Sequence, residues 1–146
     1  LVVIDPLGSV NLRLLMWNGG FKAFKQKPII GHGYQNTGLV ASRYLSDGNA
    51  KTFIKDQKML HNDYLNSLVG FGIPGLLVFL ALLFLPLTLF FKQLKANRYC
   101  TRSSIGILFI IALSVFAFTD SIYSHNVMRS FVVFFLGVLL PVAKKE

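Results

Sequence analysis

The chain has 146 residues, of which 53% are hydrophobic and 14 are Phe, and its formal net charge is +9. This composition is typical of an integral membrane protein, and it argues against nucleic-acid binding because the cations are divided among loops that separate long apolar runs. Cys100 has no partner for a disulfide, so redox chemistry is not expected.

The opening residues, LVVIDPLG, lack the basic segment of a signal peptide. We interpret the chain as the C-terminal piece of a larger polytopic protein, with residues 1–4 as the tail or edge of a preceding span. A complete three-span protein is the alternative interpretation.

An amphipathic helix is predicted over residues 9–27. One narrow stripe at helical spacing carries its apolar residues, which are Val10, Leu14, Trp17, Phe21 and Phe24. Lysines and asparagines form the opposite stripe, a pattern typical of a helix lying in the membrane interface. Gly19-Gly20 is expected to weaken or kink this helix. Arg13 lies beside the apolar stripe, where it either extends its charge into water or binds a lipid phosphate.

The stretch KPIIGHGYQNTG, residues 27–38, predicts a tight turn and an open loop. Its backbone amides could form an anion-binding nest, but a structural turn is the favoured interpretation. Residues 35–57 are polar and irregular, with a short helix near 38–45. Arg43 belongs to a basic solvated face there and is a possible substrate contact.

A polar cluster precedes the first apolar run. His61, Tyr64 and Leu68 share one helical face that continues from the loop into the membrane. With only three histidines and no pair of acids at ligand spacing, a metal site is not expected. Taken alone, His61 reads as an interfacial histidine with its hydrogen bonds satisfied.

Three charge-free runs predict an up-and-down membrane path, and the short basic loop KQLKANRYCTR places their connection in the cytoplasm. The outer loop then holds eight Lys or Arg against four Asp, which suggests an anionic ligand. In chain order, the expected segments are a periplasmic loop at 1–64, a span at 65–91, a cytoplasmic loop at 92–102, a span at 103–119, a short periplasmic turn or span start at 120–129, a span at 122–143 and a cytoplasmic tail at 144–146.

Arg129 falls at the depth of the outer leaflet, where an unpaired charge is costly. Asp120 and His125 are nearby partners, so a structural pair is the first interpretation. A second contact to a substrate phosphate is the other.

Several of these features occur together in a known order. Arg13-x-x-x-Trp17, Pro28-x-x-Gly31-x-Gly33, His61-Asn62-x-x-Leu65 and Gly72-x-x-Gly75 resemble the C-terminal half of the O-antigen ligase and O-antigen polymerase superfamily. The resemblance covers about residues 9–91 and implies a GT-C-like multi-span helical bundle, here a fragment, with a large, partly helical periplasmic loop. The chain lacks the ten to twelve spans of that family and its further functional Arg in an upstream loop.

The resemblance implies a glycosyltransferase of the bacterial inner membrane, active on the periplasmic face without metal, cofactor or nucleotide sugar. Its donor is a glycan on undecaprenyl diphosphate and its acceptor is the lipid A–core. Arg13 is carried over as the diphosphate ligand and His61 as the base of an inverting displacement, or as a further diphosphate contact. Asn62 is a possible substrate contact.

Four readings remain open. The ligase comes first, and an O-antigen polymerase or a protein-directed oligosaccharide ligase would use the same donor chemistry. A transporter fragment is disfavoured because the spans at 65–91 and 103–119 contain no ionisable residue, whereas solute pathways usually do. A membrane scaffold that only binds anionic lipids is the fourth.

Overall fold

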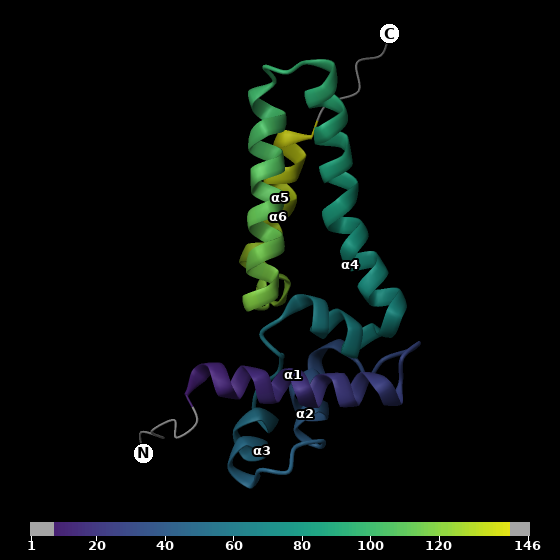
Figure 1. Ribbon diagram of the computed structural model, residues 1–146, viewed down its shortest axis with the longest axis vertical. Helices are drawn as coiled ribbons and strands as arrows, with labels where there is room; N and C mark the ends of the chain where they lie inside the picture. The colour runs from purple at the N-terminus through teal and green to yellow at the C-terminus, as the bar shows by residue number, and fades with distance from the viewer. Residues whose placement is uncertain (1–7, 141–146) are drawn as a thin grey trace.

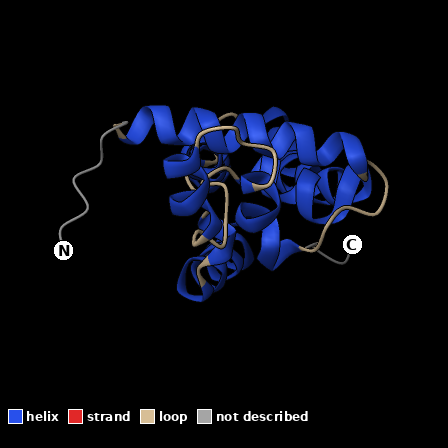
Figure 2. Ribbon diagram, turned by 90° about the horizontal axis from the view of Figure 1, so that it is seen from below, coloured by secondary structure: helices blue, strands red, loops and turns tan. Residues whose placement is uncertain are grey.

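The computed structural model describes residues 8–140, and within this range it contains helices and loops but no strand (Figure 2). The expected all-α class is therefore confirmed for the described residues. The segments expected at 1–4 and 144–146 lie outside them. The elements are α1 Ser9–Gln26, the 3₁₀ turn η1 Tyr34–Asn36, α2 Thr37–Ser42, α3 Gly48–Lys55, α4 Asp63–Ala96, α5 Thr101–Thr119, the 3₁₀ turn η2 Ile122–Ser124 and α6 Asn126–Leu139.

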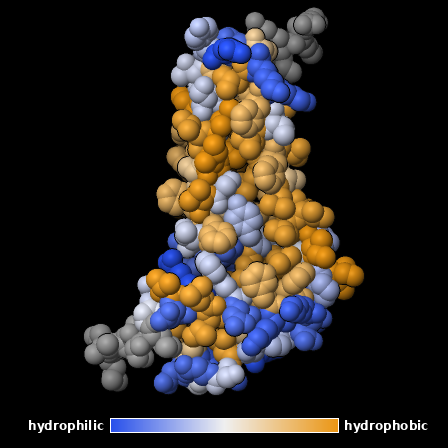
Figure 3. Space-filling view, viewed as in Figure 1, coloured by the Kyte–Doolittle hydropathy of each residue, from blue (hydrophilic) through white to orange (hydrophobic). Residues whose placement is uncertain are grey.

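The helices form two layers, an upright one and one that crosses beneath it (Figure 1). Most of α4 stands upright with α5 and α6, while α1 crosses beneath them and α2 and α3 lie on the far side of α1 (Figure 1). Apolar side chains cover the upright layer between hydrophilic groups at its two ends (Figure 3). Two helices, α4 with 34 residues and α5 with 19, are long and apolar enough to cross a membrane.

The face that α1 buries is not its most hydrophobic one. Leu12, Met16 and Ala23 are buried in the lower layer, whereas Val10 and Phe21 of the predicted stripe are exposed. The helix also runs unbroken through Gly19-Gly20, where a kink was expected. The reason is close packing: a Cβ atom added at Gly19 would come 2.5 Å from the Ala41 carbonyl oxygen of α2. The small residues therefore mark a contact rather than a weak point.

A sharp bend divides α4 at Gly72, whose backbone has φ 72° and ψ −160°. The part before the bend runs across the view just above α1, and the part after it rises through the upright layer (Figure 1). Pro74 sits in the first turn of the rising part, where its fixed φ and missing N–H are tolerated. The rising part of α4 therefore begins near Ile73, inside the expected span at 65–91.

The loop that follows α1 completes the bend. The Ile73 N–H donates to the Pro28 carbonyl at 2.8 Å, and the Gly33 N–H donates to the Gly70 carbonyl at 2.9 Å. The His32 N–H reaches the Val69 carbonyl at 2.8 Å, while its ring Nε2 contacts the Ala23 carbonyl of α1. These amides are occupied by α4, so the favoured structural-turn interpretation describes them better than an anion nest does.

The upright layer has its own core, separate from that of the lower layer. Buried residues of α4, α5 and α6 meet there, among them Phe90, Ile110 and Val132. The last expected span, 122–143, starts differently in the structure, because η2 precedes the 14-residue helix α6.

Candidate functional site

His61 lies at the junction of the two layers, two residues before α4. Its backbone adopts a left-handed conformation with φ 49°, which is uncommon for a non-glycine residue. The preceding residue, Leu60, is held by two hydrogen bonds. The Leu60 N–H donates to Asn66 Oδ1 at 2.9 Å, and the Leu60 carbonyl accepts from Trp17 Nε1 at 3.1 Å. The surrounding bonds therefore hold this backbone in place.

Asn62 and Asn66 build the support on the α4 side. Asn62 caps α4 by accepting from the Leu65 N–H at 2.9 Å, and its amide group donates to the Phe118 carbonyl of α5 at 3.1 Å. Asn66 has no exposed surface, and its side chain links three segments. Its partners are the Leu60 N–H, the Thr37 hydroxyl at 2.9 Å and the Ser121 hydroxyl at 2.7 Å. Both asparagines thus position His61 between α1, α4 and α5.

The His61 ring contacts a carboxylate from the end of α5. His61 Nδ1 lies 3.0 Å from Asp120 Oδ1, and the two side chains are 39% and 56% exposed. When Nδ1 carries the proton and donates to Asp120, Nε2 presents its lone pair and can accept a proton. Asp120 therefore selects the tautomer that a general base needs.

Asp120 is held in its ionised form by several neighbours. Partial burial acts to raise its pKa, but hydrogen bonds from His61 and the Ser121 N–H and the charges of His61 and Arg13 outweigh it, so the pKa is lowered. The Ser121 N–H donates to Asp120 Oδ1 at 2.7 Å. Asp120 is consequently an anion at neutral pH, in contact with His61 and influenced by the charge of Arg13.

Arg13 reaches this site from α1. It is an exposed residue one helical turn before Trp17, whose ring meets the Phe118 ring edge-on with centroids 5.4 Å apart. Phe118 lies two residues before Asp120, and the Arg13 charge contributes to lowering the Asp120 pKa. The structure therefore brings Arg13 and His61 to the same end of the upright layer, where the charges of both act on one carboxylate.

The other predicted residues lie elsewhere. Arg43 follows α2 and is exposed in the lower layer. Arg129, in α6, donates from its guanidinium to the Asn126 side chain. The expected structural pair between Arg129 and Asp120 or His125 was wrong, because the turn after α5 directs Asp120 toward His61 instead.

An apolar cavity of about 460 Å³ adjoins the site. It lies between α1, the first turns of α4 and the end of α5, and Asn62 is its polar lining residue. The remaining lining residues are Trp17, Phe21, Tyr64, Leu65, Leu68, Leu76, Leu80 and Phe118. The exposed apolar face of α1 thus forms one wall of a hydrophobic groove that ends beside His61.

Sequence reasoning missed two residues of this site. It considered Asp120 only as a partner of Arg129, and it passed over Asn66. Asn66 did carry a signal, since a buried amide in the first turns of an apolar helix requires partners. No local pattern could pair Asp120 with His61 across 59 residues. Within the described part of the chain, no three His, Cys, Asp or Glu side chains gather in a group that could hold a metal ion.

The chain is similar to known proteins over most of its length. A protein of Haemophilus influenzae, described only as uncharacterized, is 26% identical over 120 residues. The aligned region is 81% of this chain and 30% of that relative, so the chain spans about a third of the relative's length. The sequence profile of the family described as O-antigen ligase matches residues 4–80, which include Arg13, His61 and the bend in α4. This match covers more than half of the chain, which therefore belongs to the O-antigen ligase family, within the superfamily of O-antigen ligases and polymerases.

Proposed function

We propose that this chain carries part of the active site of an O-antigen ligase, a metal-independent, inverting glycosyltransferase. It would transfer O-antigen polysaccharide from undecaprenyl diphosphate to a hydroxyl of the lipid A–core. The observation that carries the proposal is the contact of His61 with Asp120, a carboxylate whose pKa is also lowered by the charge of Arg13, at the end of the upright layer. The site would face the periplasm of a bacterial inner membrane.

Arg13 is suited to the donor's diphosphate. Its guanidinium is always charged, and its planar fork can bind two phosphate oxygens at once. Arg13 belongs to α1, which lies across the end of the upright helices (Figure 1), and this supports a contact with the headgroup of a lipid donor there. The leaving diphosphate gains negative charge as the glycosidic bond breaks, so a guanidinium at this position stabilises the transition state.

His61 is suited to accept the proton of the acceptor. The acceptor oxygen attacks the anomeric carbon, the bond from that carbon to the phosphate oxygen breaks, and its electron pair leaves with the diphosphate. The acceptor proton passes to His61 Nε2 while Nδ1 stays bonded to Asp120. Attack from the side opposite the leaving group inverts the anomeric centre.

The apolar groove supports a lipid donor. Its wall contains Trp17 and Phe21 from α1, Leu68 and Leu76 from α4, and Phe118 from α5. A polyprenyl chain is a linear run of apolar isoprene units, and it could bury its first units there while the diphosphate remains beside Arg13. The polar and apolar parts of the donor would then match adjacent surfaces of the protein.

The test uses the full-length protein in cells that lack the native gene. His61→Asn is preferred to alanine because asparagine tolerates the left-handed backbone at this position. Loss of a general base costs about 10²–10⁴-fold in rate, and Arg13→Ala should also abolish transfer. Lys55→Ala is the control, because it removes one positive charge from an exposed position at the end of α3.

Lipopolysaccharide gels distinguish the outcomes, with protein levels checked by immunoblot. A ligase predicts that both variants lose the long-chain ladder while lipid-linked glycan accumulates. A single capped repeat would instead identify a polymerase, and an unchanged ladder from both variants would reject catalysis at this site.

A further inference from the structure

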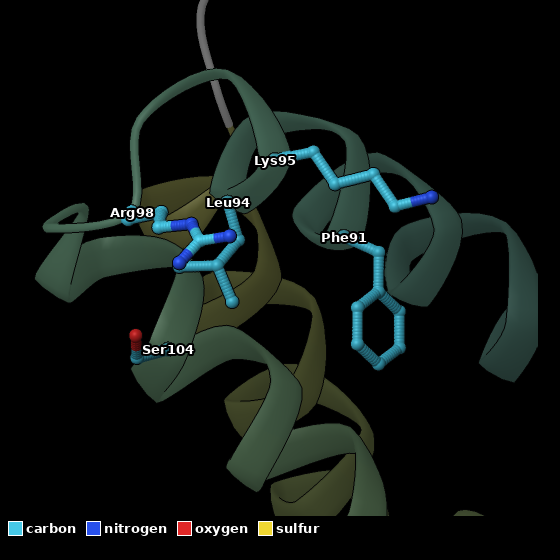
Figure 4. Close-up of a pocket in the computed structure, with 5 residues that line it drawn as sticks. All are labelled: Phe91, Leu94, Lys95, Arg98 and Ser104. Atoms are coloured by element: carbon cyan, nitrogen blue, oxygen red, sulfur yellow. The ribbon is translucent and has the colours of Figure 1, made fainter.

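A second pocket, lined in part by polar residues, lies at the opposite end of the upright layer, where the chain turns from α4 into α5. The pocket has a volume of about 470 Å³ and is lined by Phe91, Leu94, Lys95, Arg98 and Ser104 (Figure 4). Phe91, Leu94 and Lys95 come from the last turns of α4, Arg98 from the connecting turn and Ser104 from the first turn of α5. It is separated from His61 by the length of both helices (Figure 1).

The protein builds this pocket with its own contacts. Asn97 shapes the turn by accepting from the Tyr99 N–H through its side chain and from the Cys100 N–H through its backbone, both at 3.1 Å. The Ser103 hydroxyl donates to Gln93 Oε1 at 2.7 Å and so ties α5 to α4. These bonds fix the backbone on both sides of Arg98.

The two helices also touch directly just below the pocket. The Phe90 side chain is fully buried, and a Cβ atom added at Gly106 would come 2.6 Å from its ring. Glycine therefore lets α5 approach α4 at this depth. This packing holds together the two helices that line the pocket.

The pocket is strongly basic. The segment 92–102 contains four cations and no acid. Lys95 and Arg98 line the pocket itself, whereas Lys92 and Arg102 lie in the same segment outside the lining. No carboxylate of the described residues forms an ion pair with Lys95 or Arg98. Two cations and a hydroxyl beside apolar side chains are complementary to a ligand that is anionic at one end and apolar at the other.

We propose that this pocket binds the headgroup of an anionic membrane phospholipid. The Arg98 guanidinium, which lies over Leu94 (Figure 4), would bind the phosphate oxygens, and the acyl chains would run down past Phe91 and Leu94. The Lys95 ammonium extends past Phe91, away from Arg98, and would add positive charge at the rim of the pocket. The apolar surface of α4 and α5 continues directly from the pocket (Figure 3). A free phosphate would use only the polar half of this lining. The proposal does not depend on the reaction at His61.

The test measures lipid binding to the purified full-length protein. Native mass spectrometry would count bound phosphatidylglycerol against phosphatidylcholine for the wild type, the double variant Lys95→Gln/Arg98→Gln and the matched control Lys92→Gln/Arg102→Gln. Both variants lose two positive charges from the same exposed segment. We expect phosphatidylglycerol to bind at least 10-fold more weakly to the pocket variant, and to bind the control as it binds the wild type.

Three results would overturn the proposal. Equal losses in the two variants would show that charge alone attracts the lipid, without a pocket. Displacement of the lipid by millimolar inorganic phosphate would identify a free-phosphate site. Equal retention of phosphatidylglycerol and phosphatidylcholine by the wild type would exclude anion recognition. Monodisperse elution of both variants establishes that they are folded.

Discussion

Replacing Asp120 by Asn tests whether the carboxylate assists proton transfer to His61. The substitution keeps the size of the side chain and an oxygen that can accept from the Ser121 N–H. It removes the negative charge that faces His61 Nδ1 at 3.0 Å. In the proposed reaction His61 becomes positive, so the transition state should lose electrostatic stabilisation while the substrates still bind.

The geometry sets the size of this effect. Two unit charges about 4 Å apart interact by about 1 kcal/mol in water and about 4 kcal/mol at the dielectric of a protein surface. Because the two side chains are 39% and 56% exposed, the lower half of that range applies. A loss of about 1–2 kcal/mol corresponds to turnover that is about 5- to 30-fold slower.

The assay is glycan transfer by the purified full-length protein, with kcat and KM measured separately. The decrease should appear in kcat, because Asp120 acts on the developing charge and not on the bound donor. Asp56→Asn, at the exposed end of α3, makes the same charge change away from the site. If Asp120→Asn and Asp56→Asn have the same kcat, the electrostatic role of Asp120 is refuted.

The same variant makes a prediction about stability and pH. The pKa of Asp120 is lowered in the folded protein, so its ionised form stabilises the fold at neutral pH. That contribution is complete above the unfolded pKa of about 3.9 and is lost as the pH falls through the lower folded value. The Tm difference between wild type and Asp120→Asn should therefore be present at pH 7 and disappear in strong acid; a difference that stays constant with pH would contradict this.

Two further substitutions test the support of the site. Asn66→Ala removes three buried hydrogen bonds and should lower the free energy of unfolding by about 3 kcal/mol, whereas exposed Asn49→Ala should change Tm little; equal Tm values for the two variants would refute the role of Asn66. Gly72→Ala places a side chain at φ 72° and against the Ile29 carbonyl, so folded yield should fall sharply. Gly137→Ala, with open space around the added methyl group, should be neutral or stabilising, and similar yields from both glycine variants would show that the bend is not required.

The long helices could be predicted from the sequence because their signal is local. Recognising a charge-free apolar run long enough to cross a bilayer requires only counting, and α4 and α5 both contain such a run. The bend within α4 is harder to predict. Glycines and Pro74 favour a bend in this helix, but its position depends on the Pro28 carbonyl from a distant loop.

The packing of α1 could not be predicted from hydrophobicity. Its stripe of large apolar residues faces outward and lines the groove through Trp17 and Phe21. The buried face contains Gly19, Gly20 and Ala23, which carry little hydrophobic signal but permit close contact. Because α1 lies between the apolar groove and a packed layer, it has two apolar faces. A search for a single stripe finds only one of them.

The charge of Asp120 bears on whether one site could contain both a phosphate ligand and a base. A guanidinium beside a base disfavours arrival of a proton at that base. Asp120 contacts His61 Nδ1 and is also acted on by the charge of Arg13, so in the proposed reaction its negative charge would stabilise the imidazolium that forms. Arg13 remains free to face the diphosphate, since its partner in the protein is only a through-space charge. Asp120 would therefore allow one small site to contain both a phosphate ligand and a base.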